Sequence, residues 1–179
     1  MRRLLLAPTA VAAALALFPA TASACGDKFV VLGRGMRLLS VKSAMHPASI
    51  LIYMNPVSRV PAAEKEFQLQ STLKLAGHKP AAVEDARAFD KALASGKYDL
   101  VLADLSDAPA LEQEVRASAS KPTVIPLVYN PTGAELVAAE KQYSCLVKAS
   151  KKNHDLLTVV DEAMMSKSRG AGASCQKTK

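Results

Sequence analysis

The chain has 179 residues, of which 50% are hydrophobic and 22% are charged, and this composition excludes an intrinsically disordered protein. Its length fits one domain that is large enough to bury a proper hydrophobic core. The formal net charge is +7, but the basic residues are scattered and lack interleaved aromatic side chains, so we expect no nucleic-acid partner.

The amino terminus has the three parts of a secretory signal peptide. Arg2 and Arg3 supply the positive charge, the apolar run at 4–18 is too short to span a bilayer comfortably, and Ala22-Ser-Ala24 provides a small-residue cleavage site. We therefore expect a signal peptide at 1–24 and a periplasmic or secreted protein.

Cleavage at that site would make Cys25 the first residue of the exported chain. Ordinary cleavage is favoured over a lipid anchor on Cys25, because Ala22 is a poor substitute for the leucine that usually precedes a lipidated cysteine by three residues. No later run of about 18 apolar residues occurs, so we expect no integral membrane segment after cleavage.

Three cysteines in an oxidising compartment allow at most one internal disulfide bond. Cys145 lies in an apolar, strand-like run, and we expect it to be a buried and inert thiol. Cys25 and Cys175 lie outside the regular elements, and we predict that they form the bond. In a parallel α/β fold the last helix ends near the amino ends of the strands, where the N-terminal segment also enters.

A regular alternation of strand-like and helix-like segments fills residues 47–169. Residues 29–32 form a short β-like run before it, and we assign 25–46 to an N-terminal extension. Strands are expected at 50–54, 81–84, 100–104, 123–129 and 145–149. Helices are expected at 62–76, 86–94, 110–119, 133–142 and from Asn153, a good N-cap, to 167.

Five strands that alternate with five helices predict an α/β fold, a three-layer αβα sandwich around one doubly wound parallel sheet. Pro80 assigns the second strand to an edge of the sheet, because proline has no N–H group to donate. Residues 170–179 are rich in Gly, Ser and Lys, and we expect a flexible polar tail there.

The third strand carries the leading candidate for a functional residue. Residues 100–103 are all apolar, which is typical of a strand that is buried on both faces, and the strand then ends in Asp104. In open α/β sheets, ligands bind beyond the carboxyl ends of the strands. Asp104 is therefore placed where chemistry would occur in such a fold.

Four short segments from Ala48 to about Ser168 together resemble the receiver domain of bacterial response regulators. They are Leu73-x-x-Ala76-Gly77-His78, Ala88-x-x-x-Ala92-Leu93, Tyr98-Asp-Leu-Val-Leu-Ala-Asp104 and Leu146-Val-Lys148. The resemblance implies a flavodoxin-like strand order 2-1-3-4-5. It also implies that Asp104 is the phospho-acceptor position, that Lys148 binds the phosphoryl group, and that Mg²⁺ is held by an acidic pair at the end of the first strand.

The chain departs from this family at the metal site. Met54 and Asn55 stand in place of the acidic pair, and a thioether is a useless ligand for Mg²⁺ while an amide is a weak one. An exported domain also has no ATP-dependent histidine kinase beside it. We therefore expect no metal and no cofactor, and we expect the Asp104 carboxylate to pair with Lys148 in a structural role.

The favoured interpretation is an exported pseudo-receiver, a non-catalytic signalling or protein-interaction module with a protein partner. It is not expected to be an enzyme, and the sequence contains neither a Gly-x-Ser-x-Gly nor a Cys-x-x-Cys motif. Two alternatives stay open. One is a genuine phosphorelay receiver that uses Asp104, and the other is a periplasmic small-ligand-binding domain with a pocket near Asn55, Asp104 and Lys148.

Overall fold

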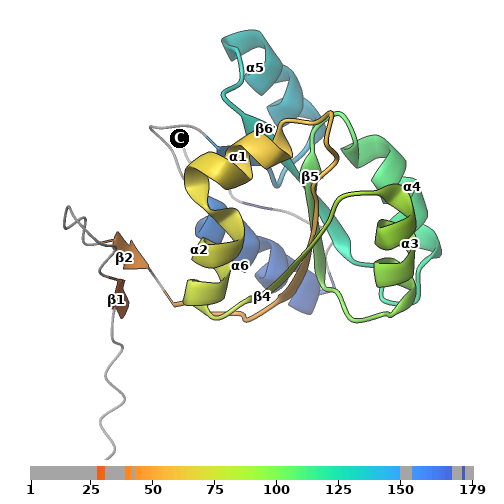
Figure 1. Cartoon of the computed structure of the whole chain (residues 1–179), viewed down its shortest axis with the longest axis horizontal. Coiled ribbons are helices and arrows are strands. Elements are labelled where there is room, and N and C mark those ends of the chain that lie inside the picture. The colour runs from red at the N-terminus through yellow and green to blue at the C-terminus, as the bar shows by residue number, and fades with distance from the viewer. Residues whose placement is uncertain (1–27, 31–38, 42, 150–154, 171–174, 176–179) are drawn as a thin grey trace, which may run out of the picture.

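The computed structural model describes residues 28–30, 39–41, 43–149, 155–170 and 175. Near the amino terminus, strands β1 (Lys28–Val30) and β2 (Leu39–Val41) pair antiparallel in a small sheet of their own. Figure 1 shows this pair apart from the main sheet. The β-like run expected at 29–32 thus coincides with a strand over the residues described, and 31–38 lie outside them.

The main sheet has five parallel strands in the order β4-β3-β5-β6-β7, which confirms the flavodoxin-like order 2-1-3-4-5. Pro80 lies in the edge strand, as its missing N–H group predicted. The strands are β3 (Ser49–Tyr53), β4 (Lys79–Val83), β5 (Leu100–Asp104), β6 (Thr123–Tyr129) and β7 (Val147–Ala149).

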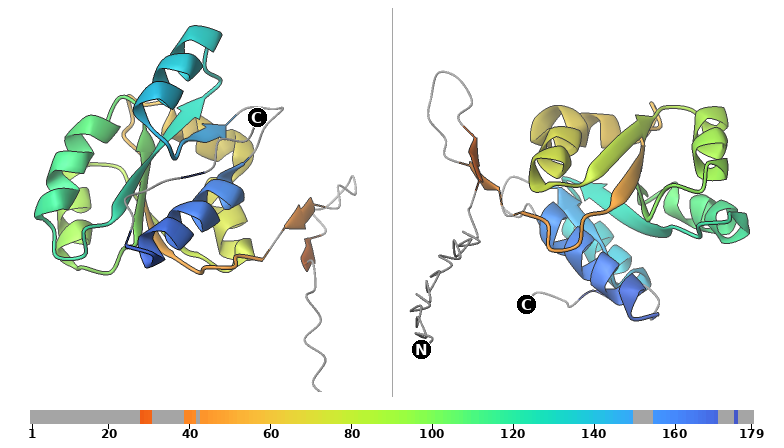
Figure 2. Two further views of the ribbon diagram at one scale, coloured as in Figure 1. Left: turned by 180° about the vertical axis from the view of Figure 1, so that it is seen from behind. Right: turned by 90° about the horizontal axis from the view of Figure 1, so that it is seen from below.

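Helices cover both faces of this sheet, so the expected three-layer sandwich is confirmed (Figure 2). Helices α1, α2 and α6 pack on one face, and α3, α4 and α5 pack on the other. The helices are α1 (Val60–Phe67), α2 (Leu69–Ala76), α3 (Ala86–Ala94), α4 (Ala108–Ala117), α5 (Gly133–Gln142) and α6 (Leu156–Ser168). Among the helices that the structure describes, none combines the length and the hydropathy of a membrane span.

Strand alternation decides which face each core side chain reaches. In β5, Leu100 and Leu102 pack with α1, α2 and α6, whereas Val101 and Ala103 pack with α3 and α4. All five residues of β5 are buried, as expected for a strand that is covered on both sides. By the same alternation, the side chain of Asp104 belongs to the face that carries α1.

The single helix expected at 62–76 is two helices, separated by Gln68 in a left-handed conformation with φ of 49°. Ala63 and Leu69 are both fully buried. In one continuous helix their side chains would point in directions about 120° apart, because each residue turns the helix by about 100°. The break brings both onto the sheet, and the Glu64 side chain accepts a hydrogen bond from the Gln70 N–H across it.

Other boundaries differ from expectation by a few residues. Helix α4 begins at Ala108, two residues earlier than expected, and β7 begins at Val147, two residues later. Asp155 is the N-cap residue of α6, whereas Asn153, the expected cap, lies outside the described residues.

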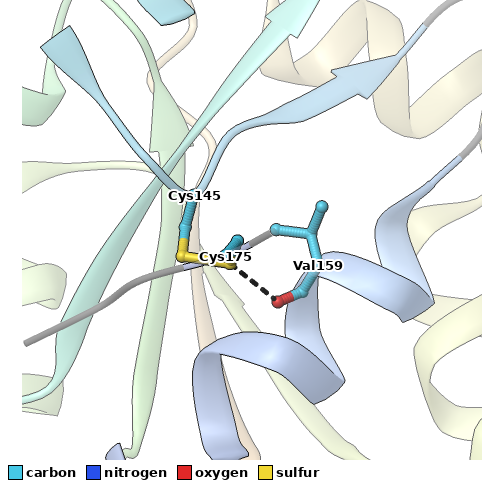
Figure 3. The surroundings of a disulfide bond; sticks show 3 residues. All are labelled: Cys145, Val159 and Cys175. Carbon is cyan, nitrogen blue, oxygen red and sulfur yellow. Dashed lines mark hydrogen bonds between the residues drawn. A yellow bond between two sulfur atoms is a disulfide. The ribbon is translucent and has the colours of Figure 1, made fainter. Parts of the chain in front are cut away.

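The disulfide bond joins Cys145 to Cys175, whose Cα atoms are 4.9 Å apart (Figure 3). The predicted bond between Cys25 and Cys175 is therefore wrong, and Cys145 is buried but is not a free thiol. Cys175 lies beside Cys145, which is two residues before the start of β7 at the amino edge of the sheet.

The bond also corrects the expectation for the carboxyl terminus. Cys175 is 9% exposed and belongs to the core cluster under α6, where its Sγ atom lies 3.7 Å from the Val159 carbonyl oxygen. A flexible tail over 170–179 is therefore wrong at this residue, because a disulfide bond fixes it to the core. A disulfide bond fits a protein of an oxidising compartment.

Reducing the Cys145–Cys175 bond should lower the free energy of unfolding by about 3–4 kcal/mol, since the bond closes a loop with a sequence separation of 30 residues. Urea denaturation with and without reductant measures this difference. Cys25→Ser is the matched control and should unfold at the wild-type midpoint, whereas Cys175→Ser should unfold like the reduced protein. Equal destabilisation by the two substitutions would contradict the pairing.

Candidate functional site

A pocket of about 160 Å³ lies at the carboxyl edge of the sheet, where the carboxyl ends of the parallel strands meet. Its walls come from the ends of β5 and β6, from the loops that follow them, and from the starts of α1 and α5. It is lined by Arg59, Asp104, Leu105, Ser106, Leu127, Val128, Tyr129, Pro131 and Glu135. Asp104 thus lies at the kind of position where α/β sheets bind ligands.

The Asp104 carboxylate is bonded internally through both of its oxygens. Its Oδ2 atom accepts a hydrogen bond of 3.0 Å from the Arg59 backbone N–H. Its Oδ1 atom accepts hydrogen bonds from the Ser106 backbone N–H at 3.0 Å and from the Ser106 hydroxyl at 2.8 Å. Asp104 is 7% exposed. Its side chain connects the end of β5 to the loop before α1 and to the loop before α4.

The bond to Arg59 replaces a missing helix cap. Arg59 is the N-cap residue of α1, and its own side chain makes no capping hydrogen bond. The first N–H groups of a helix lack partners within the helix and carry partial positive charge, so a carboxylate there is stabilising. Asp104 supplies that carboxylate from the neighbouring strand. Ser58 adds a second contact, because its hydroxyl accepts a hydrogen bond from the Val60 N–H.

Lys148 does not pair with Asp104, and the expected ion pair is wrong. The Lys148 Nζ atom lies 2.6 Å from a carboxylate oxygen of Glu140 on α5. The sheet explains this, because Lys148 is in register with Val128, whose side chain packs beneath α5. Asp104 is in register with Leu127, whose side chain packs on the opposite face with α1 and α6. The two side chains therefore leave the sheet from different faces.

Met54 and Asn55 are both engaged inside the protein. Met54 packs against the core, with its sulfur 4.0 Å from the Gln70 side-chain nitrogen. Asn55 begins a turn, in which its backbone oxygen accepts a hydrogen bond from the Ser58 N–H and its side-chain oxygen accepts one from the Val57 N–H.

The Asn55 side-chain nitrogen donates to the Asp107 carboxylate, with distances of 3.2 and 3.3 Å to its two oxygens. Burial is the main cause that raises the pKa of Asp107, and the charge of Asp104 adds to it. These residues do not fit a Mg²⁺ ion, because the amide is already used and a thioether is no ligand for it. Within the described residues, no group of three His, Cys, Asp or Glu side chains could hold a metal ion.

An ion pair between Arg59 and Glu135 crosses the rim of the pocket, with a guanidinium nitrogen 2.8 Å from a carboxylate oxygen. Glu135 also completes a capping box with Thr132 at the start of α5. The hydrogen bond from Arg59, together with those from Thr132, lowers the pKa of Glu135 to about 2. Sequence reasoning missed both residues of the ion pair, although Thr132-x-x-Glu135 is itself a recognisable capping-box pattern.

Tyr129 closes the pocket on the side of α1. Its hydroxyl group donates a hydrogen bond to the Glu66 carboxylate, and its ring packs edge-to-face with Phe67 at a centroid distance of 6.2 Å. The bond to Glu66 raises the pKa of the Tyr129 hydroxyl. The C-terminal end of α1 thus contacts Tyr129 of β6, and its N-cap residue Arg59 contacts Asp104 of β5.

Replacing Asp104 with alanine should lower the free energy of unfolding by about 2–3 kcal/mol, because the N–H groups of Arg59 and Ser106 lose their acceptor. Urea denaturation of Asp104→Ala, Lys148→Ala and the double variant measures the coupling between the two positions. We expect a coupling energy below about 0.5 kcal/mol, as for residues that do not interact. A coupling energy several times larger would show that Asp104 and Lys148 do interact and would contradict the structure.

Comparisons with known proteins give no relative for this site. A scan against models of protein families, a search of curated proteins and a search of solved structures each found no match. An α/β fold with the flavodoxin-like strand order is therefore what is established for this chain, and any function has to be argued from the geometry of the carboxyl edge.

Proposed function

We propose that the protein is an exported, receiver-like interaction module that binds a protein partner and carries out no phosphoryl transfer. The observation that carries this proposal is the state of Asp104, whose two carboxylate oxygens hold the start of α1 and the β5–α4 loop in place. A carboxylate that accepts these hydrogen bonds has a structural role, because it fixes the loops at the carboxyl edge. A surface whose loops are fixed in this way supports the binding of a protein partner.

The chemistry of phosphoryl transfer supports the same conclusion. The reaction depends on positioning and on positive charge that neutralises the transferred group. An attack by Asp104 would have to use an oxygen that already accepts at least one internal hydrogen bond, which makes that oxygen less nucleophilic. Lys148 is held by Glu140 on the other side of the sheet, and Asn55 and Met54 do not offer a site for Mg²⁺. Both sources of positive charge that a receiver uses are therefore missing at Asp104.

The size of the pocket favours a protein partner over a small ligand. Pockets for drug-sized ligands usually have volumes of roughly 300–1,000 Å³, whereas this pocket has about 160 Å³. Its charged rim is also neutralised internally, because Arg59 is paired with Glu135. The periplasmic or secreted location in this proposal comes from the signal-peptide pattern at 1–24 and is consistent with the disulfide bond.

Incubating the wild-type protein with Mg²⁺ and acetyl phosphate should leave its intact mass unchanged, because Lys148 is paired with Glu140 and Met54 and Asn55 offer no Mg²⁺ site beside Asp104. Beryllofluoride with Mg²⁺ should likewise give no bound species in fluorine NMR spectra. Asp104→Asn is the matched control and should behave as the wild type does. A phosphoryl adduct that forms on the wild type and is absent from Asp104→Asn would overturn the proposal in favour of a working phospho-acceptor.

The partner is expected at the carboxyl edge, which site-specific photo-cross-linking can test. Val57 lies two residues before Arg59 at this edge and is 91% exposed. A photo-reactive amino acid at Val57 should give a discrete cross-linked species in cells that produce the protein. The control position is Leu75, a 41% exposed apolar residue near the end of α2 at the opposite edge, which should give none. The same products from both positions, or none from Val57, would contradict a partner at this edge.

A further inference from the structure

A short segment at the amino edge of the sheet, opposite the pocket, connects the N-terminal part of the chain to β3. We call residues 44–48 the latch segment. At its first residue, the Ala44 N–H donates a hydrogen bond of 2.8 Å to the Ala76 carbonyl oxygen at the end of α2. At its last residue, the Ala48 carbonyl oxygen accepts a hydrogen bond of 2.8 Å from the Lys79 N–H.

Its other three backbone contacts use titratable side chains. The Asp161 carboxylate on α6 accepts hydrogen bonds from the N–H groups of His46 at 3.1 Å and of Met45 at 3.4 Å. The His78 Nδ1 atom accepts a hydrogen bond of 3.2 Å from the Ala48 N–H. The segment is therefore held against α6 and the start of β4 by one carboxylate and one imidazole.

The contact with Ala48 requires a neutral His78. An Nδ1 atom that accepts a hydrogen bond carries no proton, so the single proton of the neutral ring lies on Nε2. His78 is 3% exposed, and its Nε2 atom is buried with no hydrogen-bond partner among the described residues. A second proton, on Nδ1, would place one donor against another at the Ala48 N–H and would bury a charge.

We propose that the latch segment is a pH-sensitive contact, released when His78 takes up a second proton and can no longer accept the Ala48 N–H. The consequence is local, because Ala48 directly precedes β3 and the core of the sheet keeps its own contacts. Acidification would therefore loosen the latch segment at Ala48, next to β3, while its bonds to Ala76 and Asp161 and the five-stranded sheet stay in place.

The direction of the effect follows from linkage. Burial lowers the pKa of His78 below its ordinary value of 6.5, and the charge of Asp161 opposes this in part. The open segment then binds more protons than the closed one. The closed form is fully stabilised above about pH 6.5 and loses stability as the pH falls from there through the lower pKa of the closed form.

Other ionisable groups lie close to the segment. The Asp99 carboxylate accepts a hydrogen bond from the Ser49 N–H, directly after Ala48, and is paired with Lys167. Asp161 is on α6, His46 is in the latch segment itself, and the side chain of Lys79 follows His78 on β4 and is exposed. His46 makes its bond to Asp161 through the backbone N–H, so its own protonation leaves that bond in place. Of the two imidazoles His46 and His78, it is His78 whose ring nitrogen accepts a hydrogen bond from the segment, so its protonation removes that acceptor.

Hydrogen exchange of the Ala48 amide, measured by NMR and corrected for intrinsic rates, tests the proposal. Between about pH 7.5 and about pH 5 the protection of this amide should fall about tenfold, because each proton-linked opening becomes more favourable below the ordinary pKa. The Leu102 amide in the centre of β5 is the internal reference, and its protection should change much less. Equal changes for both amides, or no change for Ala48, would overturn the proposal.

His78→Asn keeps an acceptor near the position of Nδ1 but cannot be protonated in this pH range, so its Ala48 protection should no longer depend on pH. His154→Asn is the matched control and should keep the wild-type dependence. If the His78 variant does not fold, the wild-type imidazole can be titrated by nitrogen NMR. The Ala48 amide shift should then follow the His78 titration, and a His78 titration that leaves the Ala48 amide unaffected would overturn the proposal.

Discussion

The carboxylate of Asp104 holds the carboxyl edge of this protein together. Strand alternation directs its side chain to the face of the sheet that carries α1, and there it binds the first N–H group of that helix and the loop before α4. The contact between Asn55 and Asp107 joins the same two loops a second time. The walls of the pocket are therefore held in place by the acidic residue that ends the central strand β5.

The same contact limits what the edge can bind. A helix N-terminus attracts anions, but the start of α1 already faces a carboxylate of the protein itself. The Arg59 guanidinium is likewise paired with Glu135, which stays ionised because of that pair and its capping box. The positive charge of both groups is thus neutralised within the structure, which disfavours the binding of an anionic group such as a phosphoryl group. A preformed edge of this kind is consistent with the proposed contact between proteins.

The parts of this structure that depend on local pattern could be predicted from the sequence. Continuous apolar runs predicted the buried strands, Pro80 marked the edge strand, and Gly133 to Gln142 was predicted with both of its ends correct. The side-chain contacts of the site could not be predicted, because they depend on the face of the sheet to which each strand residue directs its side chain. Asp104 ends β5 and Lys148 lies one residue before the end of β7 at the same edge, yet one residue of register sends their side chains to opposite faces.

If Asp104 is committed to its internal hydrogen bonds, it binds no divalent metal ion. Titrating the wild-type protein with Mn²⁺, a paramagnetic substitute for Mg²⁺, tests this directly, because bound Mn²⁺ broadens the NMR signals of nearby amides. We expect the amides of Arg59 and Ser106 to broaden no more than that of Gly77 at the opposite edge. Selective broadening of the Arg59 and Ser106 signals at low Mn²⁺ concentrations would contradict it.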